Sequence, residues 1–278
     1  MSVKVGLVRV PVETVYVKTD NDFIVDIIPA YFSGITNTVR DYLKEIEDDI
    51  GYEVRLVDLG ELDFGLEENS LPYKRNVDIW GRESLKEVTL DMLFEERERL
   101  FARKEEFDLL VCLGLSHFGG LLLYEDNERV ARLDCHGDYF EEHKVRFKGA
   151  NYASYMNTVE RRFPNAKIVN YGVKTGLGDE RMSFLGEDGF MGDDEHLTAN
   201  HFDIDVDCFS EDLRISRLYH CSDLQPYGVE RMISQAKPKK IGIWEYRPEH
   251  DMRGYGFQFI VNSIRAAAGD REGVQEAV

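Results

Sequence analysis

Two short segments of this 278-residue sequence carry potential metal ligands at alternate positions. Asp134, His136 and Asp138 form the first segment, and Asp203 and Asp205 belong to the second. Each segment follows an apolar run, and a strand points alternate side chains to one face, so each segment can direct its polar groups to one point. Two unit charges about 4 Å apart interact by about 4 kcal/mol at an effective dielectric of 20, so four converging carboxylates would repel strongly. A divalent metal ion would relieve this repulsion, and the spacing therefore predicts a metalloenzyme.

Two further polar residues stand where apolar runs end. His117 lies where the run 107–115 meets a glycine-rich turn, and Glu245 directly follows the run 240–244. Taken singly, His117 would be a core or turn histidine, Glu245 a salt-bridge partner, and the segment 203–207 a solvated or calcium-binding loop. That segment lacks the glycine and the distal glutamate of an EF-hand loop. Chance rarely places four such segments at strand ends, so we expect them to share one site.

Apolar runs alternate along the chain with segments of helical spacing, and the two patterns predict strands and helices. The expected strands are residues 3–10, 53–59, 107–115, 129–133, 167–173, 199–204 and 240–246, and the expected helices are 35–49, 83–104, 152–163, 228–235 and 255–268. This order predicts an α/β fold of three layers, a mostly parallel sheet flanked by helices on both faces, as a single domain over residues 1–278. In such sheets ligands bind beyond the carboxyl ends of the strands, where the four polar segments fall.

The amino-acid composition limits the kinds of molecule that we expect this protein to bind. Aspartate and glutamate number 53 against 34 lysines and arginines, a formal charge of −19, which disfavours nucleic acid and anionic membranes. The excess suits a cationic small molecule and metal ions, although solubility alone would also explain it. The four cysteines form no CxxC pair, and we expect buried free thiols in the cytoplasm, with Cys135 pointing away from the ligands beside it. The N-terminus has no apolar stretch typical of a signal peptide, and no run approaches a membrane span.

At the four polar segments the sequence resembles the arginase/agmatinase (ureohydrolase) superfamily. That family carries a Gly-Asp-His-Ser-like segment, then Asp-Ala-His-x-Asp, then Ser-x-Asp-x-Asp, then Glu-Val-Asn-Pro. The corresponding stretches here are 114–118, 134–138, 202–205 and 245–248, in the same order. The resemblance implies an arginase-like fold and a binuclear site with two Mn²⁺ ions per chain, which oxygen-rich ligands suit better than Zn²⁺. The implied metal ligands are His117, Asp134, His136, Asp138, Asp203 and Asp205.

The resemblance also implies a reaction. A hydroxide activated by the two metals would attack the planar carbon of a linear guanidino or amidine compound and cleave a C–N bond. The glutamate at the position of Glu245 would pair with the cationic substrate group, because a carboxylate can accept two parallel N–H bonds. The resemblance also suggests a homo-oligomer, a trimer or hexamer.

The sequence departs from the family pattern at two places. Ser116 stands where the family usually has aspartate, and the loop 139–152 lacks the usual His-Gly pair that shuttles protons to the leaving amine. His143 or Lys148 could take that catalytic role, and Asn151 and Arg247 could contact the substrate. Two alternative functions therefore stay open: a related amide or acetamide hydrolase of the deacetylase type with one Zn²⁺, and a metal-binding protein that has lost turnover.

Overall fold

The computed structural model describes residues 3–10, 12–18, 23–29, 54–61, 90–114, 116–139, 155–172, 198–209, 224–246, 251 and 253–269. Within these ranges, seven strands form one sheet in the order β4-β1-β5-β9-β8-β6-β7, and every pair of neighbours is parallel. The strands are β1 (Val3–Val10), β4 (Val54–Glu61), β5 (Leu109–Gly114), β6 (Arg129–Leu133), β7 (Lys167–Tyr171), β8 (His201–Asp205) and β9 (Lys240–Trp244). The three-layer α/β prediction is confirmed, and the sheet is parallel throughout these strands.

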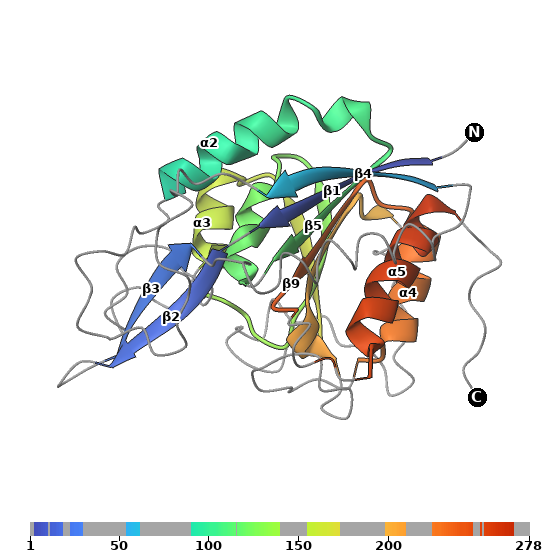
Figure 1. The fold of residues 1–278 in the computed structure, drawn as a ribbon. Helices are drawn as coiled ribbons and strands as arrows, with labels where there is room; N and C mark the ends of the chain where they lie inside the picture. Colours follow the sequence, from blue (N-terminus) through green and yellow to red (C-terminus); the bar gives the residue numbers. More distant parts are fainter. Residues whose placement is uncertain are drawn as a thin grey trace.

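Helices cover both faces of the sheet (Figure 1). Helices α4 (Pro226–Ala236) and α5 (Tyr255–Ala268) pack on one face, and α2 (Leu90–Phe101) and α3 (Tyr155–Arg162) lie on the other. Short 3₁₀ turns η3 (Lys104–Glu106), η4 (His117–Leu122) and η7 (Val206–Cys208) follow α2, β5 and β8. No helix among the described residues is long and apolar enough to cross a membrane.

Strand alternation divides the core into two clusters. In β8, Phe202 and Ile204 point to the cluster beneath α4 and α5, so Asp203 and Asp205 point to the opposite face, the side of α2, α3 and η4. In β6, Ala131 and Leu133 face α4 and α5 in the same way, which leaves the alternate positions of that strand to the acidic side. The sheet therefore directs both polar segments to one of its two faces.

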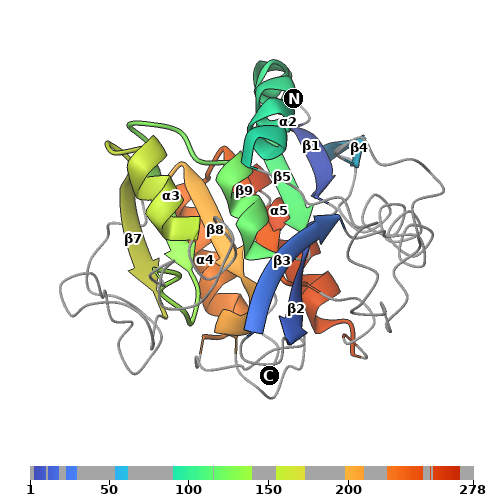
Figure 2. The same cartoon turned by 90° about the vertical axis from the view of Figure 1, so that its left-hand side faces the viewer.

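Two strands lie outside this sheet. β2 (Val12–Lys18) and β3 (Phe23–Pro29) pair antiparallel and form a separate hairpin, and Figures 1 and 2 show it projecting beyond the end of β1. The sequence pattern did not predict this hairpin. The helix expected at residues 35–49 lies outside the described residues.

Candidate metal centre

The four polar segments meet at the carboxyl ends of four adjacent strands. In sheet order, β5 leads to His117, β9 to Glu245, β8 ends at Asp205 and β6 leads to Asp134. Of the expected site residues, the structure brings together His117, Asp134, His136, Asp138, Asp203, Asp205 and Glu245. The other four, His143, Lys148, Asn151 and Arg247, lie outside the described residues.

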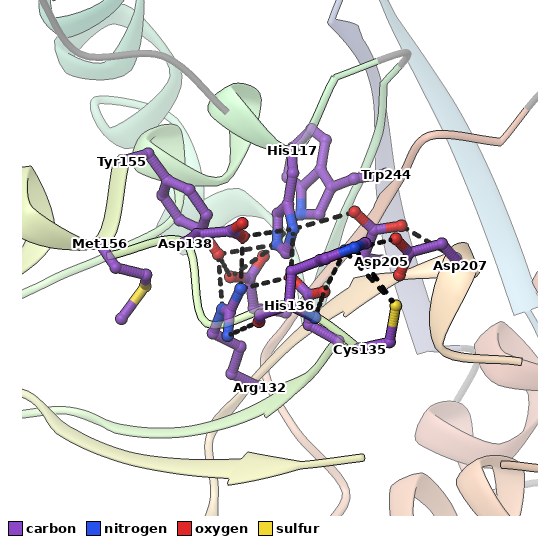
Figure 3. Close-up of polar contacts among 12 residues, drawn as sticks. His117, Arg132, Cys135, His136, Asp138, Tyr155, Met156, Asp205, Asp207 and Trp244 are labelled. Carbon is purple, nitrogen blue, oxygen red and sulfur yellow. Dashed lines mark hydrogen bonds and ion pairs between the residues drawn. The ribbon is translucent and has the colours of Figure 1, made fainter. Parts of the chain in front are cut away.

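His117 lies at the middle of the cluster and is buried (Figure 3). Its Nδ1 is 2.9 Å from Asp134 Oδ2, 3.1 Å from Asp205 Oδ2 and 3.6 Å from Asp138 Oδ2, and its Nε2 is 3.2 Å from Asp203 Oδ2. Burial alone would lower the pKa of His117, but these carboxylates, Asp203 foremost, raise it well above its usual value. In the metal-free protein the imidazole therefore acts as a cation among aspartates.

Asp203 lies behind His117 and is held by three donors. Tyr124 Oη and Trp244 Nε1 each donate at 2.6 Å, and Tyr155 Oη donates at 3.0 Å. Burial would raise the pKa of Asp203, but His117 and the hydrogen bonds lower it strongly. Its oxygens are thus already satisfied by protein groups, and Asp203 is absent from the described clusters that could hold an ion.

Three glycines make room for the indole that reaches Asp203. A Cβ atom at Gly114 or Gly119 would lie 2.7 Å from the ring of Trp244, and one at Gly242 would lie 2.6 Å from it. The indole therefore lies flat against bare backbone from β5, η4 and β9. The sequence showed these glycines only as a glycine-rich turn and an apolar run.

Arg132 is a buried cation that the sequence reasoning missed. Its side chain is 0% exposed, and it donates to Tyr155 Oη at 2.8 Å, to the carbonyl of His136 at 2.9 Å and to Asp138 Oδ2 at 2.5 Å, and also to Asp134 Oδ2. Burial would raise the pKa of Asp134, but Arg132 holds it well below its usual range. A signal was present in the sequence: an arginine inside a buried strand, two positions before Asp134 and so on the same face.

His117, Asp134 and Asp138 form the first group of ligand atoms that lie within 4.8 Å of one another, and we call it the inner cluster. Burial raises the pKa of Asp138 well above its usual value, and the neighbouring Asp134 adds to this effect. The inner cluster offers one imidazole and two carboxylates, to which Arg132 already supplies a positive charge.

A second group, which we call the outer cluster, consists of Asp205, Asp207 and Glu245. A third group consists of Asp134, Cys135, His136 and Asp207, and it shares Asp207 with the outer cluster. His136 Nδ1 is 2.8 Å from Asp207 Oδ2, and 42% of the His136 side chain is exposed. Hydrogen bonds with Asp134 and Asp207 raise the pKa of His136 to about 11. Burial, Asp207 and Glu245 together raise the pKa of Asp205 well above its usual value. The outer cluster thus brings three buried carboxylates together, and the imidazoles of His117 and His136 contact two of them.

The donor set of the outer cluster fits a hard divalent ion. Carboxylate oxygens with an imidazole suit Mn²⁺ or Mg²⁺, whereas a soft ion would need thiolates. Asp207 supplies an independent observation, because its Oδ1 is buried and has no hydrogen-bond partner. The sequence reasoning had left Asp207 out of the ligands, although the alternation of Asp203 and Asp205 continues to it.

Cys135 corrects two expectations. It is disulfide-bonded rather than a free thiol, whereas Cys112 and Cys208 are free and buried as expected. Its Sγ is 3.4 Å from His136 Nδ1, so it does not point away from the ligands. The prediction failed because β6 ends at Leu133, and strand alternation does not extend through the turn that follows.

Two residues of the site have an unusual backbone. Asp138 and Glu245 are non-glycine residues with positive φ, 53° and 59°. The left-handed conformation at the end of β9 turns the chain sharply and places the buried Glu245 carboxylate beside Asp205 and Asp207.

Fold and site together define an arginase-type α/β chain with potential metal ligands at the carboxyl edge of its sheet. Solved structures of similar fold include the agmatine ureohydrolase of Thermoplasma volcanium, with a TM-score of 0.64 and 12% identity over 98% of this chain and 90% of that one. The arginase from Bacillus subtilis has a TM-score of 0.63 and 15% identity, over 97% of this chain and 99% of that one. The proclavaminate amidino hydrolase from Streptomyces clavuligerus has a TM-score of 0.59 and 13% identity, over 96% and 91%.

Comparisons based on sequence alone found no similar protein. No family profile matches the chain, and no curated protein matches it. The solved structures therefore confirm the predicted arginase-like fold. Because their sequence identities to this chain are only 12% to 15%, they show the fold alone.

Proposed function

We propose that this protein is a metal-dependent hydrolase of the ureohydrolase type, which cleaves a C–N bond of a linear guanidino or amidine compound. The observation that carries the proposal is the outer cluster: buried carboxylates from β8 and β9, one with an unpartnered oxygen, at the carboxyl edge of an arginase-type sheet. Solved structures with this fold include proteins named arginase, agmatine ureohydrolase and formimidoylglutamase.

The ion would be held by the outer cluster together with His136 and Asp134. Oxygen donors predominate in this set, which favours Mn²⁺. When bound, a divalent ion would lower the pKa of a water molecule toward roughly 7 and so supply a nucleophile at neutral pH.

Glu245 would orient the substrate. Its carboxylate is buried at the edge of the site, and a carboxylate accepts two parallel N–H bonds from a planar guanidinium or amidinium. Such a bidentate contact fixes the orientation of the carbon under attack as well as contributing binding energy. His143 or Lys148 would deliver a proton to the leaving amine, and Asn151 and Arg247 would contact the rest of the substrate. We further propose a homo-oligomer, which sedimentation would test.

An activity panel tests this function. Protein loaded with Mn²⁺ is incubated with arginine, agmatine, formiminoglutamate and related guanidino compounds, and urea, ammonia or formamide release is measured. Acetylated amines are included, because acetate release would instead support a deacetylase. No product from any compound at full manganese occupancy would contradict hydrolysis and favour a metal-binding protein without turnover.

A pair of matched variants tests the role of Glu245. Glu245→Gln should abolish turnover while changing manganese affinity little. Glu230→Gln is the control, because Glu230 is another buried glutamate but lies in α4, where it accepts from Asn262 Nδ2 of α5 at 3.2 Å. The control should retain activity. Equal loss of turnover and manganese binding in Glu245→Gln would instead make Glu245 a metal ligand.

A further inference from the structure

We infer that the guanidinium of Arg132 takes the place of one of the two metal ions that the arginase-type fold suggests, so that this chain holds a single divalent ion, in the outer cluster. The inference rests on the proposed function, since it concerns the metal count of the same site.

The first argument is position. The inner cluster consists of His117 Nδ1 and the Oδ2 atoms of Asp134 and Asp138. Arg132 Nη2 donates to both of these Oδ2 atoms, at 2.5 Å for Asp138. A metal ion bound by the inner cluster would have to share these two oxygens with a fixed positive charge, which repels it. The arginine therefore supplies these two carboxylates with the positive charge that an ion would supply.

The second argument is that Arg132 is fixed in place. Its Nε donates to Tyr155 Oη, and its Nη1 donates to the carbonyl of His136 and, at 3.2 Å, to Asn170 Oδ1. All three nitrogens thus have partners inside the protein, and the side chain is fully buried on β6, an interior strand of the sheet. A guanidinium cannot lose its charge in a protein, so it cannot make way for an ion by deprotonation.

The third argument is the contrast with the outer cluster. Among the described residues, Asp205 and Asp207 pair with His117 and His136 and with no lysine or arginine. Asp207 Oδ1 is buried without a partner. The two carboxylate oxygens of Asp134 have different partners. Oδ2 accepts a hydrogen bond from Arg132, whereas Oδ1 accepts one from the backbone N–H of His136 and lies 3.6 Å from His136 Nδ1. Arg132 thus gives the inner cluster a permanent cation, whereas Asp205 and Asp207 contact imidazoles, which can release a proton and bind a metal ion.

Metal stoichiometry of the wild-type protein is the direct test. The protein is dialysed against excess Mn²⁺, freed of unbound ion, and analysed for manganese per chain and by electron paramagnetic resonance. We expect one ion per chain and the spectrum of an isolated Mn²⁺. Two ions per chain with an exchange-coupled spectrum would overturn the inference and leave the proposed function standing. No bound manganese would overturn both.

Two matched variants separate the clusters. Asp138→Asn changes the inner cluster, and we expect the Kd for Mn²⁺ to rise by no more than about tenfold, the lower end of the effect of a residue that only supports ligands. Asp207→Asn changes the outer cluster and should raise the Kd more than about a hundredfold, beyond that supporting range. Loss of one of two ions in Asp138→Asn would overturn the inference.

Replacement of Arg132 gives the converse result. Arg132→Met, if folded by circular dichroism, should take up a second Mn²⁺ that the wild-type protein excludes. A folded Arg132→Met protein that still binds one ion would show that Arg132 is not the excluding group. Should this variant fail to fold, the wild-type spectrum and the two aspartate variants still decide the question.

Discussion

Asp203→Asn should destabilise the metal-free fold strongly. The carboxylate accepts hydrogen bonds from Tyr124, Tyr155 and Trp244, and asparagine can keep only the bond from the indole in the same geometry. Its amide nitrogen would face two hydroxyl groups that now donate, and Tyr155 cannot readily reverse because its oxygen already lies 2.8 Å from both Arg132 Nε and His117 Nε2. A hydrogen bond to a charged group contributes about 1.5–3 kcal/mol, so losing two costs about 3–6 kcal/mol.

The pH dependence of this stability has a definite sign. The folded state holds the pKa of Asp203 below its ordinary value. The stabilisation is therefore fully present above the ordinary aspartate pKa of about 3.9, and it is lost as pH falls toward the folded pKa. Asp203→Asn should remove this contribution at neutral pH.

Urea denaturation of the metal-free proteins, followed by tryptophan fluorescence and circular dichroism, measures the difference in unfolding free energy. Asp207→Asn is the matched control, and it should leave the metal-free fold as stable or more stable, because burial and Asp134 raise the pKa of Asp207 despite its contact with His136, so its charge is unfavourable in the folded state. If Asp203→Asn left the unfolding free energy unchanged but abolished manganese binding, Asp203 would be a metal ligand, as the sequence predicted.

Three further predictions concern groups outside the candidate ligands. Lys240→Met removes the buried ammonium that lies 2.5 Å from Glu128, and the unfolding free energy in urea should fall by about 3–5 kcal/mol; an unchanged value would show that the ion pair adds nothing. Burial raises the pKa of Glu230 from 4.5 to about 7, so the folded state retains a proton that the unfolded chain releases, and stability should fall by about 3 kcal/mol as pH rises through that interval. Glu230→Gln should reduce the dependence of the unfolding free energy on pH, measured by urea titrations at several pH values. A pH dependence equal to that of the wild-type protein would show that Glu230 is not its source. Gly242→Ala places a methyl group 2.6 Å from the Trp244 ring, and melting should report a loss of about 1–3 kcal/mol unless the indole can shift freely.

The main sheet could be predicted because its strands are buried apolar runs. β1 and β6 have the predicted bounds, Val3–Val10 and Arg129–Leu133, and the other main-sheet strands differ by a few residues at their ends. The β2–β3 hairpin was missed because it lies outside the alternation of strands and helices that determined the prediction. Both the predicted sheet and the missed hairpin follow from the pattern of residue types along the chain, and neither prediction depended on side-chain packing.

The site was predicted only as far as local spacing reaches. Asp203, Asp205 and Asp207 alternate in the sequence, so spacing alone cannot decide which two extend beyond the sheet; β8 ends at Asp205, and Asp207 lies in the turn η7. The partners of Asp203 could not be found from sequence either, since Tyr124 is 79 residues away and Trp244 is 41 residues away. Their contact depends on the strand order of the folded sheet.

The left-handed backbone at Asp138 and Glu245 has a consequence for how this chain can vary. A residue with a Cβ atom pays about 1–2 kcal/mol for that conformation, which glycine adopts freely. Glycine at either position would therefore relax the turn and delete a carboxylate in the same step. Fold stability therefore favours glycine at these two positions, whereas the candidate site requires an acidic residue.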